Sequence, residues 1–68
     1  MISINRVFVR VSMAKKEINQ KQLAVDSGIS ESTLSNILTG KSDGTPKTWG
    51  KIATALGVDV TEIIETVE

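Results

Sequence analysis

The sequence predicts an all-α fold, a compact bundle of five helices that forms one domain over residues 1–68. Two observations lead to this prediction. Three times, the sequence has an apolar residue, then a capping residue, and then a second apolar residue four positions after the cap. This pattern is typical of a helix start with a hydrophobic staple. In addition, Gly28, Gly40 and Gly57 each follow an apolar stretch, where a glycine in the left-handed conformation would end a helix.

The composition limits both the stability and the chemistry of the chain. A chain of 68 residues buries only about 60% of the surface that its unfolded form exposes, so its core is small. Cys and His are absent, which removes disulfides and the usual zinc and haem ligands, and the Ser and Thr hydroxyls have no base to activate them. We therefore expect no metal, no cofactor and no enzymatic activity.

The hydrophobic pattern predicts no membrane segment. The longest apolar run, Val7 to Val9, is far shorter than a membrane span or the core of a signal peptide requires. We therefore expect a soluble, cytoplasmic protein.

The N-terminal segment contains two competing patterns. Val7, Val9 and Val11 alternate as they would in a strand. A helix would instead place on one side the residues Ile2, Asn5, Arg6, Val9 and Met13. We favour the helix, because a single strand would have no neighbour to pair with.

The second and third helices are predicted on either side of Gly28. The second covers residues 20–27 and begins at the cap Asn19, which completes a capping box with Gln22. The third covers residues 31–39. Its inward side is expected to consist of Leu34, Ile37 and Leu38.

A loop of turn-forming residues, 40–46, precedes the last two helices. The fourth helix is predicted over residues 46–56, with Pro46 in its first turn. The fifth is predicted over residues 60–65, after a capping box led by Asp59. The fourth helix is expected to bury Trp49, Ile52, Ala53 and Leu56.

The outward side of the third helix is polar and almost uncharged. Solvated helix faces usually carry Lys and Glu, so this side favours a surface that reads DNA bases over one that only keeps the domain soluble. An amide such as that of Asn36 can bond adenine twice, a carboxylate such as that of Glu31 can accept from cytosine, and a hydroxyl such as that of Ser32 can donate or accept. The outward residues are Ser30, Glu31, Ser32, Ser35, Asn36 and Thr39.

A helix, a tight turn with one glycine and a second helix with a polar outer side form the plan of a helix-turn-helix. Residues 9–65 resemble the Cro and phage-repressor family of lambda-repressor-like (XRE) helix-turn-helix domains. The similar stretches are NQKQLA, SGIS, STLSNILTGK and a Pro-led helix that ends in ALGV. The resemblance implies a lambda-repressor-like bundle with the helix-turn-helix proper at residues 20–39.

The resemblance also implies a function. Such a protein binds double-stranded DNA sequence-specifically, as a small phage or bacterial transcription regulator, and we expect a repressor whose third helix enters the major groove. The base-reading residues would be Ser30, Glu31, Ser32 and Asn36. The residues at the DNA backbone would be Asn19, Gln20, Lys21, Thr39, Lys41 and Lys47, because helix N-termini and lysines bind phosphates.

The net charge of zero conceals an uneven distribution. Residues 1–57 contain all eight Lys and Arg with four acidic residues, whereas residues 58–68 contain four acidic residues and no base. Asp43 and Gly44 also lie in a loop that often carries basic residues in the family. A second function therefore stays open, a protein-interaction module of the antitoxin or antirepressor type. No small-molecule ligand is evident.

One apolar pattern exceeds what the core requires. On a fifth helix, one side would consist of Val60, Ile63, Ile64 and Val67. We interpret this side as a homodimer contact. Two reading helices would then face successive major grooves about 34 Å apart on a near-palindromic site.

Overall fold

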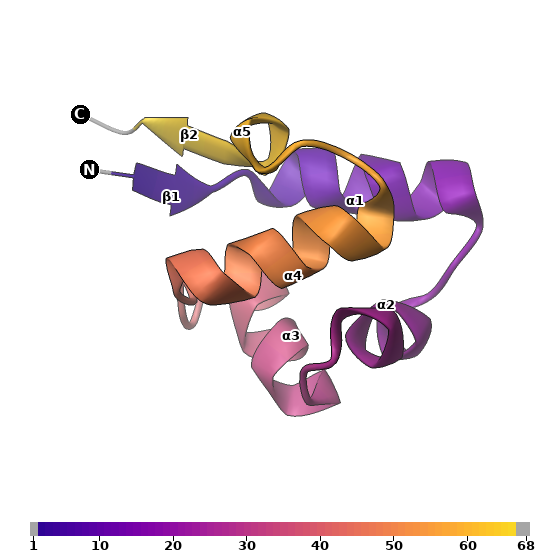
Figure 1. Ribbon diagram of the computed structural model, residues 1–68. Helices are drawn as coiled ribbons and strands as arrows, with labels where there is room; N and C mark the ends of the chain where they lie inside the picture. The colour runs from indigo at the N-terminus through magenta and orange to yellow at the C-terminus, as the bar shows by residue number, and fades with distance from the viewer. Residues whose placement is uncertain (1, 67–68) are drawn as a thin grey trace.

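The computed structural model describes residues 2–66, and its elements are shown in Figure 1. In chain order they are β1 Ile2–Ile4, α1 Arg6–Lys16, α2 Gln20–Ser27, α3 Glu31–Thr39, α4 Pro46–Leu56, α5 Val60–Ile63 and β2 Ile64–Thr66. The predicted all-α class is confirmed, because five helices form the bulk of these residues and the only sheet among them has two short strands. None of these helices is long and apolar enough to cross a membrane.

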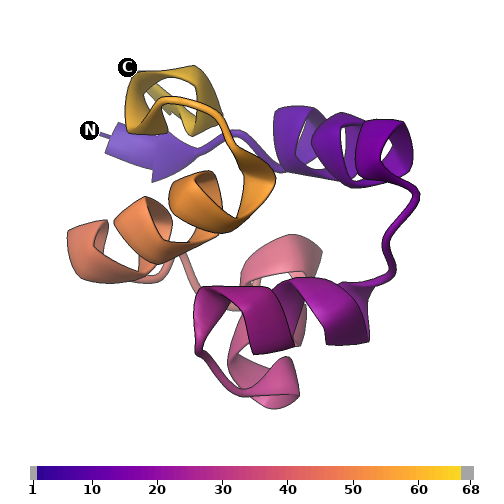
Figure 2. The same ribbon diagram turned by 45° about the vertical axis from the view of Figure 1, so that its right-hand side comes forward.

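The helices are arranged in two groups around α4. Figures 1 and 2 show the sheet with α5 on one side of the molecule and α2 with α3 on the opposite side. The most extensive helix–helix contact is between α2 and α4, and α3 packs mainly on α2. The helix that was predicted to read DNA therefore lies at the edge of the bundle, away from the chain termini.

The five helices begin at side chains that accept a backbone N–H, which satisfies one of the free donors of a helix start. The capping residues are Asn5, Asn19, Ser30, Thr45 and Asp59. The predicted capping box at Asn19 forms only in part. The Asn19 side chain accepts from the Gln22 N–H (2.8 Å), but the Gln22 side chain donates to Asp26 Oδ1 (2.8 Å) and does not accept from the Asn19 N–H within the described residues.

The capping box at Asp59 is complete. The Asp59 N–H donates to Glu62 Oε2 (3.0 Å), and its carboxylate accepts from the Thr61 N–H (2.9 Å) and the Thr61 hydroxyl (2.8 Å). The two bonds from Thr61, the backbone N–H bond above all, lower the pKa of Asp59 below its ordinary value. The short α5 thus has a strongly defined start.

The N-terminal helix starts later than predicted, because a strand precedes it. The strand β1 pairs antiparallel with β2 in the register Ile2↔Thr66, Ser3↔Glu65 and Ile4↔Ile64. The N–H of Asn5 also donates to the carbonyl of Ile63 (2.6 Å). The helix favoured for this segment is therefore confirmed at Val7, Val9 and Val11, which lie in α1. It is wrong for Ile2, because β1 finds a neighbouring strand at the other end of the chain.

The fifth helix is shorter than predicted for the same reason. It covers Val60–Ile63 instead of residues 60–65, and the chain continues as β2. The β-branched Ile64 pairs with Ile4 across the sheet, so sheet pairing replaces the missing helical turn.

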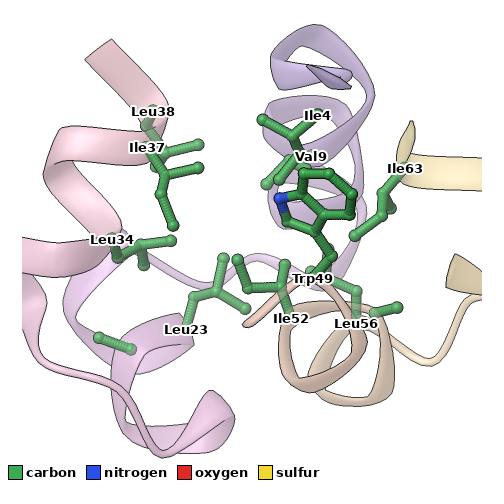
Figure 3. Packing of buried hydrophobic residues seen from close by; sticks show 12 residues of the cluster. Ile4, Val9, Leu23, Leu34, Ile37, Leu38, Trp49, Ile52, Leu56 and Ile63 are labelled. Atoms are coloured by element: carbon green, nitrogen blue, oxygen red, sulfur yellow. The ribbon is translucent and has the colours of Figure 1, made fainter. Parts of the chain in front are cut away.

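A single hydrophobic core receives side chains from both strands' ends and from all five helices. Figure 3 shows Leu34, Ile37 and Leu38 of α3 facing Trp49, Ile52 and Leu56 of α4 across the core. Fully buried side chains are Ile4, Val9, Leu23, Leu34, Ile37, Ile52 and Ile63. The predicted inward sides of the third and fourth helices are confirmed, since all of their members are buried.

The predicted dimer surface is not a helix face. Ile63 is fully buried in the core, Ile64 belongs to β2 and is half-buried, and Val60 is exposed. Val67 lies outside the described residues. A homodimer, if formed, must therefore use a different surface from the four-residue helical side that the sequence suggested.

Candidate nucleic-acid interface

A sharp turn at Gly28 joins α2 to α3. Gly28 has φ +72°, and its N–H returns to the carbonyls of Ala24 and Val25. The next N–H, that of Ile29, donates to the Ala24 carbonyl (3.1 Å). Ala24 is 2% exposed, so its small side chain allows the two helices to approach closely. The local sequence thus sets the angle between α2 and α3.

The helix α3 has one apolar and one polar side. Leu34, Ile37 and Leu38 point into the core. Ser32, Asn36 and Thr39 have the spacing i, i+4 and i+7, which places them on one side of a helix, and all are exposed. We call these three residues the outer stripe. It offers hydroxyl and amide groups and no charge.

The N-terminal end of α3 contains the other two predicted base readers. The Ser30 hydroxyl accepts from the Thr33 N–H (3.0 Å) and donates to Thr33 Oγ1 (2.7 Å), so it is already used as the cap. Glu31 is exposed in the first turn. The side chains of Glu31, Ser32 and Asn36 form no hydrogen bond with the rest of residues 2–66, which leaves their polar groups available for bases.

The residues predicted to contact the DNA backbone lie at the start of α2, at the end of α3 with the loop after it, and in α4. Asn19 caps α2 by accepting from the Gln22 N–H (2.8 Å). Gln20 is the first residue of α2 and is half-buried, and Lys21 beside it is exposed. The N–H groups at this helix start carry the partial positive charge that attracts a phosphate.

A family model described as helix-turn-helix matches residues 10–63, which is most of the chain. The chain belongs to this helix-turn-helix family. The membership indicates a function of the DNA-binding transcription-regulator type. No curated protein matches the sequence.

The remaining predicted contacts of this helix-turn-helix protein lie at the C-terminal end of α3 and beyond it. Thr39 ends α3, and its hydroxyl donates to the Ser35 carbonyl (2.8 Å). Lys41 is exposed in the loop between α3 and α4, residues 40–45. Lys47 is exposed in the first turn of α4. Within the described residues, no ion pair forms with Lys21, Lys41 or Lys47, the three lysines predicted to contact the DNA backbone.

Lys47 also borders an open depression of about 460 Å³ between α2 and α4. The residues that line it are Asp26, Ser27, Lys47, Gly50, Lys51 and Thr54. Gly50 has free space where a side chain would lie. The Ser27 hydroxyl is buried and has no hydrogen-bond partner within the described residues.

Two arginines that the sequence analysis did not select contact the helix-turn-helix. Arg6 Nε donates to the Ile37 carbonyl (2.6 Å), and Arg10 Nη2 donates to the Leu38 carbonyl (3.0 Å). Both carbonyls belong to the last turn of α3. The spacing i, i+4 could have shown that the two arginines share one side of α1, but no local pattern indicates which helix they meet.

Asp43, the acidic residue in the loop after α3, pairs with one of these two arginines. Its carboxylate lies 2.9 Å from Arg6 Nη2, as an ion pair, and accepts from the Ser3 hydroxyl (3.2 Å). The adjacent guanidinium thus opposes the negative charge of this loop. Among residues 2–66 no cluster of acidic side chains suits a metal ion.

Proposed function

We propose that this helix-turn-helix protein is a repressor that binds double-stranded DNA sequence-specifically, with α3 in the major groove. The outer stripe is the observation that supports this most. Ser32 and Asn36 are exposed and uncharged, and their side chains form no hydrogen bond within residues 2–66. Such side chains can discriminate base edges, since a well-placed bidentate amide contact contributes about 1–3 kcal/mol against the wrong base.

The binding mode uses few phosphate contacts. The start of α2 holds one phosphate through Gln20 and the helix N-terminus, while Lys21, Lys41 and Lys47 neutralise others. Each neutralised phosphate contributes about −0.9 to the slope of log affinity against log salt concentration. A single copy should therefore show a shallow slope, near −3, and useful specificity needs two copies.

Two copies would place two α3 helices in successive major grooves of a near-palindromic site, about 34 Å apart. The copies associate through a surface other than the helical side considered at first, because Ile63 is in the core. Occupation of such a site in a promoter would exclude RNA polymerase, which is the simplest mode of repression.

The test is selection of the purified protein on randomised duplexes at near-physiological salt, followed by sequencing of the retained DNA. Enrichment of a two-fold symmetric motif with half-sites one helical turn apart is the expected result. Asn36→Ala should then relax one position in each half-site. Lys41→Gln is the matched contrast, because it should weaken binding to all sequences alike and reduce the salt slope by about one.

A protein-interaction module of the antitoxin or antirepressor type is the competing function. The exposed Glu31 at the tip of α3 and the acidic residues 58–68 favour it, since both repel phosphate. A pool that shows no enrichment, together with no salt-dependent binding to DNA, would overturn DNA reading and support this alternative.

A further inference from the structure

The C-terminal end of α3 is closed differently from the ends of the other long helices. At the ends of α1, α2 and α4, a backbone N–H just beyond the cap donates to a carbonyl five residues earlier (3.1 Å each). These bonds are Ile18 to Met13, Ile29 to Ala24 and Val58 to Ala53. At α3 the N–H of Ser42 reaches the Asn36 carbonyl instead (3.1 Å). The Ile37 carbonyl also accepts from the Gly40 N–H (3.3 Å), so the same two carbonyls are used as at the other helices. Because a carbonyl oxygen has two lone pairs, Ile37 can still accept a second donor from another element.

The last turn of α3 contains no basic residue, as in α2 and α4, whereas α1 has Lys15 and Lys16 in its own last turn. A helix C-terminus attracts cations, because its free carbonyls carry partial negative charge. At α3 this role falls to Arg6 and Arg10 of α1, through the carbonyls of Ile37 and Leu38.

Arg6 joins α3 to more than one element. Its Nη2 donates to the Ser42 carbonyl (3.3 Å) and to Asp43 Oδ1 (2.9 Å). Asp43 is held in turn by the hydroxyl of Ser3 in β1, and its carbonyl accepts from Trp49 Nε1 (2.6 Å). The side chain of Arg6 is 28% exposed, so most of its surface is covered by neighbouring residues.

Small rotations of α3 would affect base reading. The helix has nine residues, so it is about 13 Å long at 1.5 Å per residue. A swing of about 5° about the turn at Gly28 would then move its far end by about 1 Å and Asn36 by about 0.7 Å, which is more than the roughly 0.5 Å within which a binding site must be held. Because α3 packs mainly on α2, its far end needs a separate attachment.

We propose that Arg6, with Asp43 as its partner, is a positioning residue for base reading: it fixes the C-terminal end of α3 so that Ser32 and Asn36 meet the base edges in register. This inference rests on the proposed function. It assigns a role in specificity to a side chain that does not belong to the outer stripe.

The geometry requires Arg at this position. The planar guanidinium reaches the Ile37 carbonyl with Nε and Asp43 with Nη2 at the same time. A Lys has the same charge but a single ammonium on a flexible chain, so it cannot reproduce this fork. Arg6→Lys therefore separates the loss of geometry from the loss of charge.

The experiment measures the affinity of the full chain for its selected duplex and for a scrambled duplex of equal length. With Arg6→Lys, the ratio of the two affinities should fall about tenfold, which equals about 1.4 kcal/mol. The affinity for the scrambled duplex and the salt slope should stay unchanged. Circular dichroism and thermal unfolding establish that the variant is folded at the assay temperature.

Lys15→Gln is the matched control, because Lys15 is an exposed cation on the same helix. It should lower both affinities slightly and together, and leave their ratio unchanged. If Arg6→Lys does not fold, Asp43→Asn replaces it. That variant removes the ion pair and keeps the side-chain shape, and its ratio should fall in the same direction by a smaller factor.

The two proposals fail in different ways. A wild-type protein that does not prefer any sequence overturns the proposed function and this inference with it. A wild-type protein that discriminates, together with a folded Arg6→Lys or Asp43→Asn variant whose ratio stays within about twofold of it, overturns this inference alone.

Discussion

The two ends of α3 are held in different ways. At the N-terminal end, Ser30 caps the helix and the N–H of Ile29 returns to Ala24, so every partner lies within a few residues in the sequence. At the C-terminal end, Arg6 and Arg10 bind the carbonyls from a helix near the start of the chain. The angle of the helix to α2 is thus set locally, and its far end is fixed by tertiary structure.

Both ends nevertheless satisfy the same electrostatic requirement. Glu31 lies in the first turn, near the positive end of the helix dipole. Arg6 and Arg10 lie at its negative end. What differs is where the groups come from. A substitution at one end of α3 should therefore leave the contacts at the other end unchanged, so the two ends can be tested separately.

The largest contrast is expected between two glycines, one at each end. Gly44 has φ +75°, and a Cβ there would lie 3.0 Å from Ile37 Cδ1 and 3.3 Å from Trp49 Nε1. Gly44→Ala should therefore cost about 2–4 kcal/mol, from left-handed strain and overpacking together. Gly28 has φ +72° and nothing within 4 Å, so Gly28→Ala should cost only about 1–2 kcal/mol. Chemical denaturation measures both, and equal losses would contradict tight packing of the loop at Gly44 against α3.

A smaller effect should isolate the N-terminal cap. Ser30→Ala removes the acceptor of the Thr33 N–H and should lower the free energy of unfolding by about 1 kcal/mol. The control is Ser32→Ala, because Ser32 is exposed in the same helix and makes no such bond. It should change stability by less than about 0.5 kcal/mol. If both variants lost the same stability, the cap would not hold this end.

The smallest effect is a gain. The Ser27 hydroxyl, just before the turn, is buried without a partner, and removing it should raise the free energy of unfolding by up to about 1 kcal/mol in Ser27→Ala. Ala is also the better helix former, and Ser32→Ala corrects for that part. Binding to the selected duplex should stay unchanged. A loss of stability would show that water or another group satisfies this hydroxyl.

The sequence predicted what depends on neighbours in the chain. The caps Asn19, Ser30 and Asp59 start helices as expected, and Gly28 and Gly40 end them. Each of these is a local hydrogen-bonding pattern, so a few adjacent residues were enough to recognise it.

The sequence did not predict what depends on contacts between distant segments. The pairing of Ile4 with Ile64 joins the two chain ends, and no pattern in either segment identified the other. The attachment of Arg6 to Ile37 and Asp43 is of the same kind. The polar outer stripe was predicted from its composition. The contacts of Arg6 and Arg10 with α3 were not predicted, because the residues next to an arginine in the sequence do not show which distant group it will contact.

Nuclear magnetic resonance of the isotope-labelled protein, titrated with its selected duplex, tests the central claim most directly. DNA reading by α3 predicts that the largest amide shift changes occur over residues 30–36 and at Asn19 and Gln20, with weaker changes at Lys41. Changes confined to α5 and β2, or no change at any amide, would contradict the assignment of α3 as the reading helix.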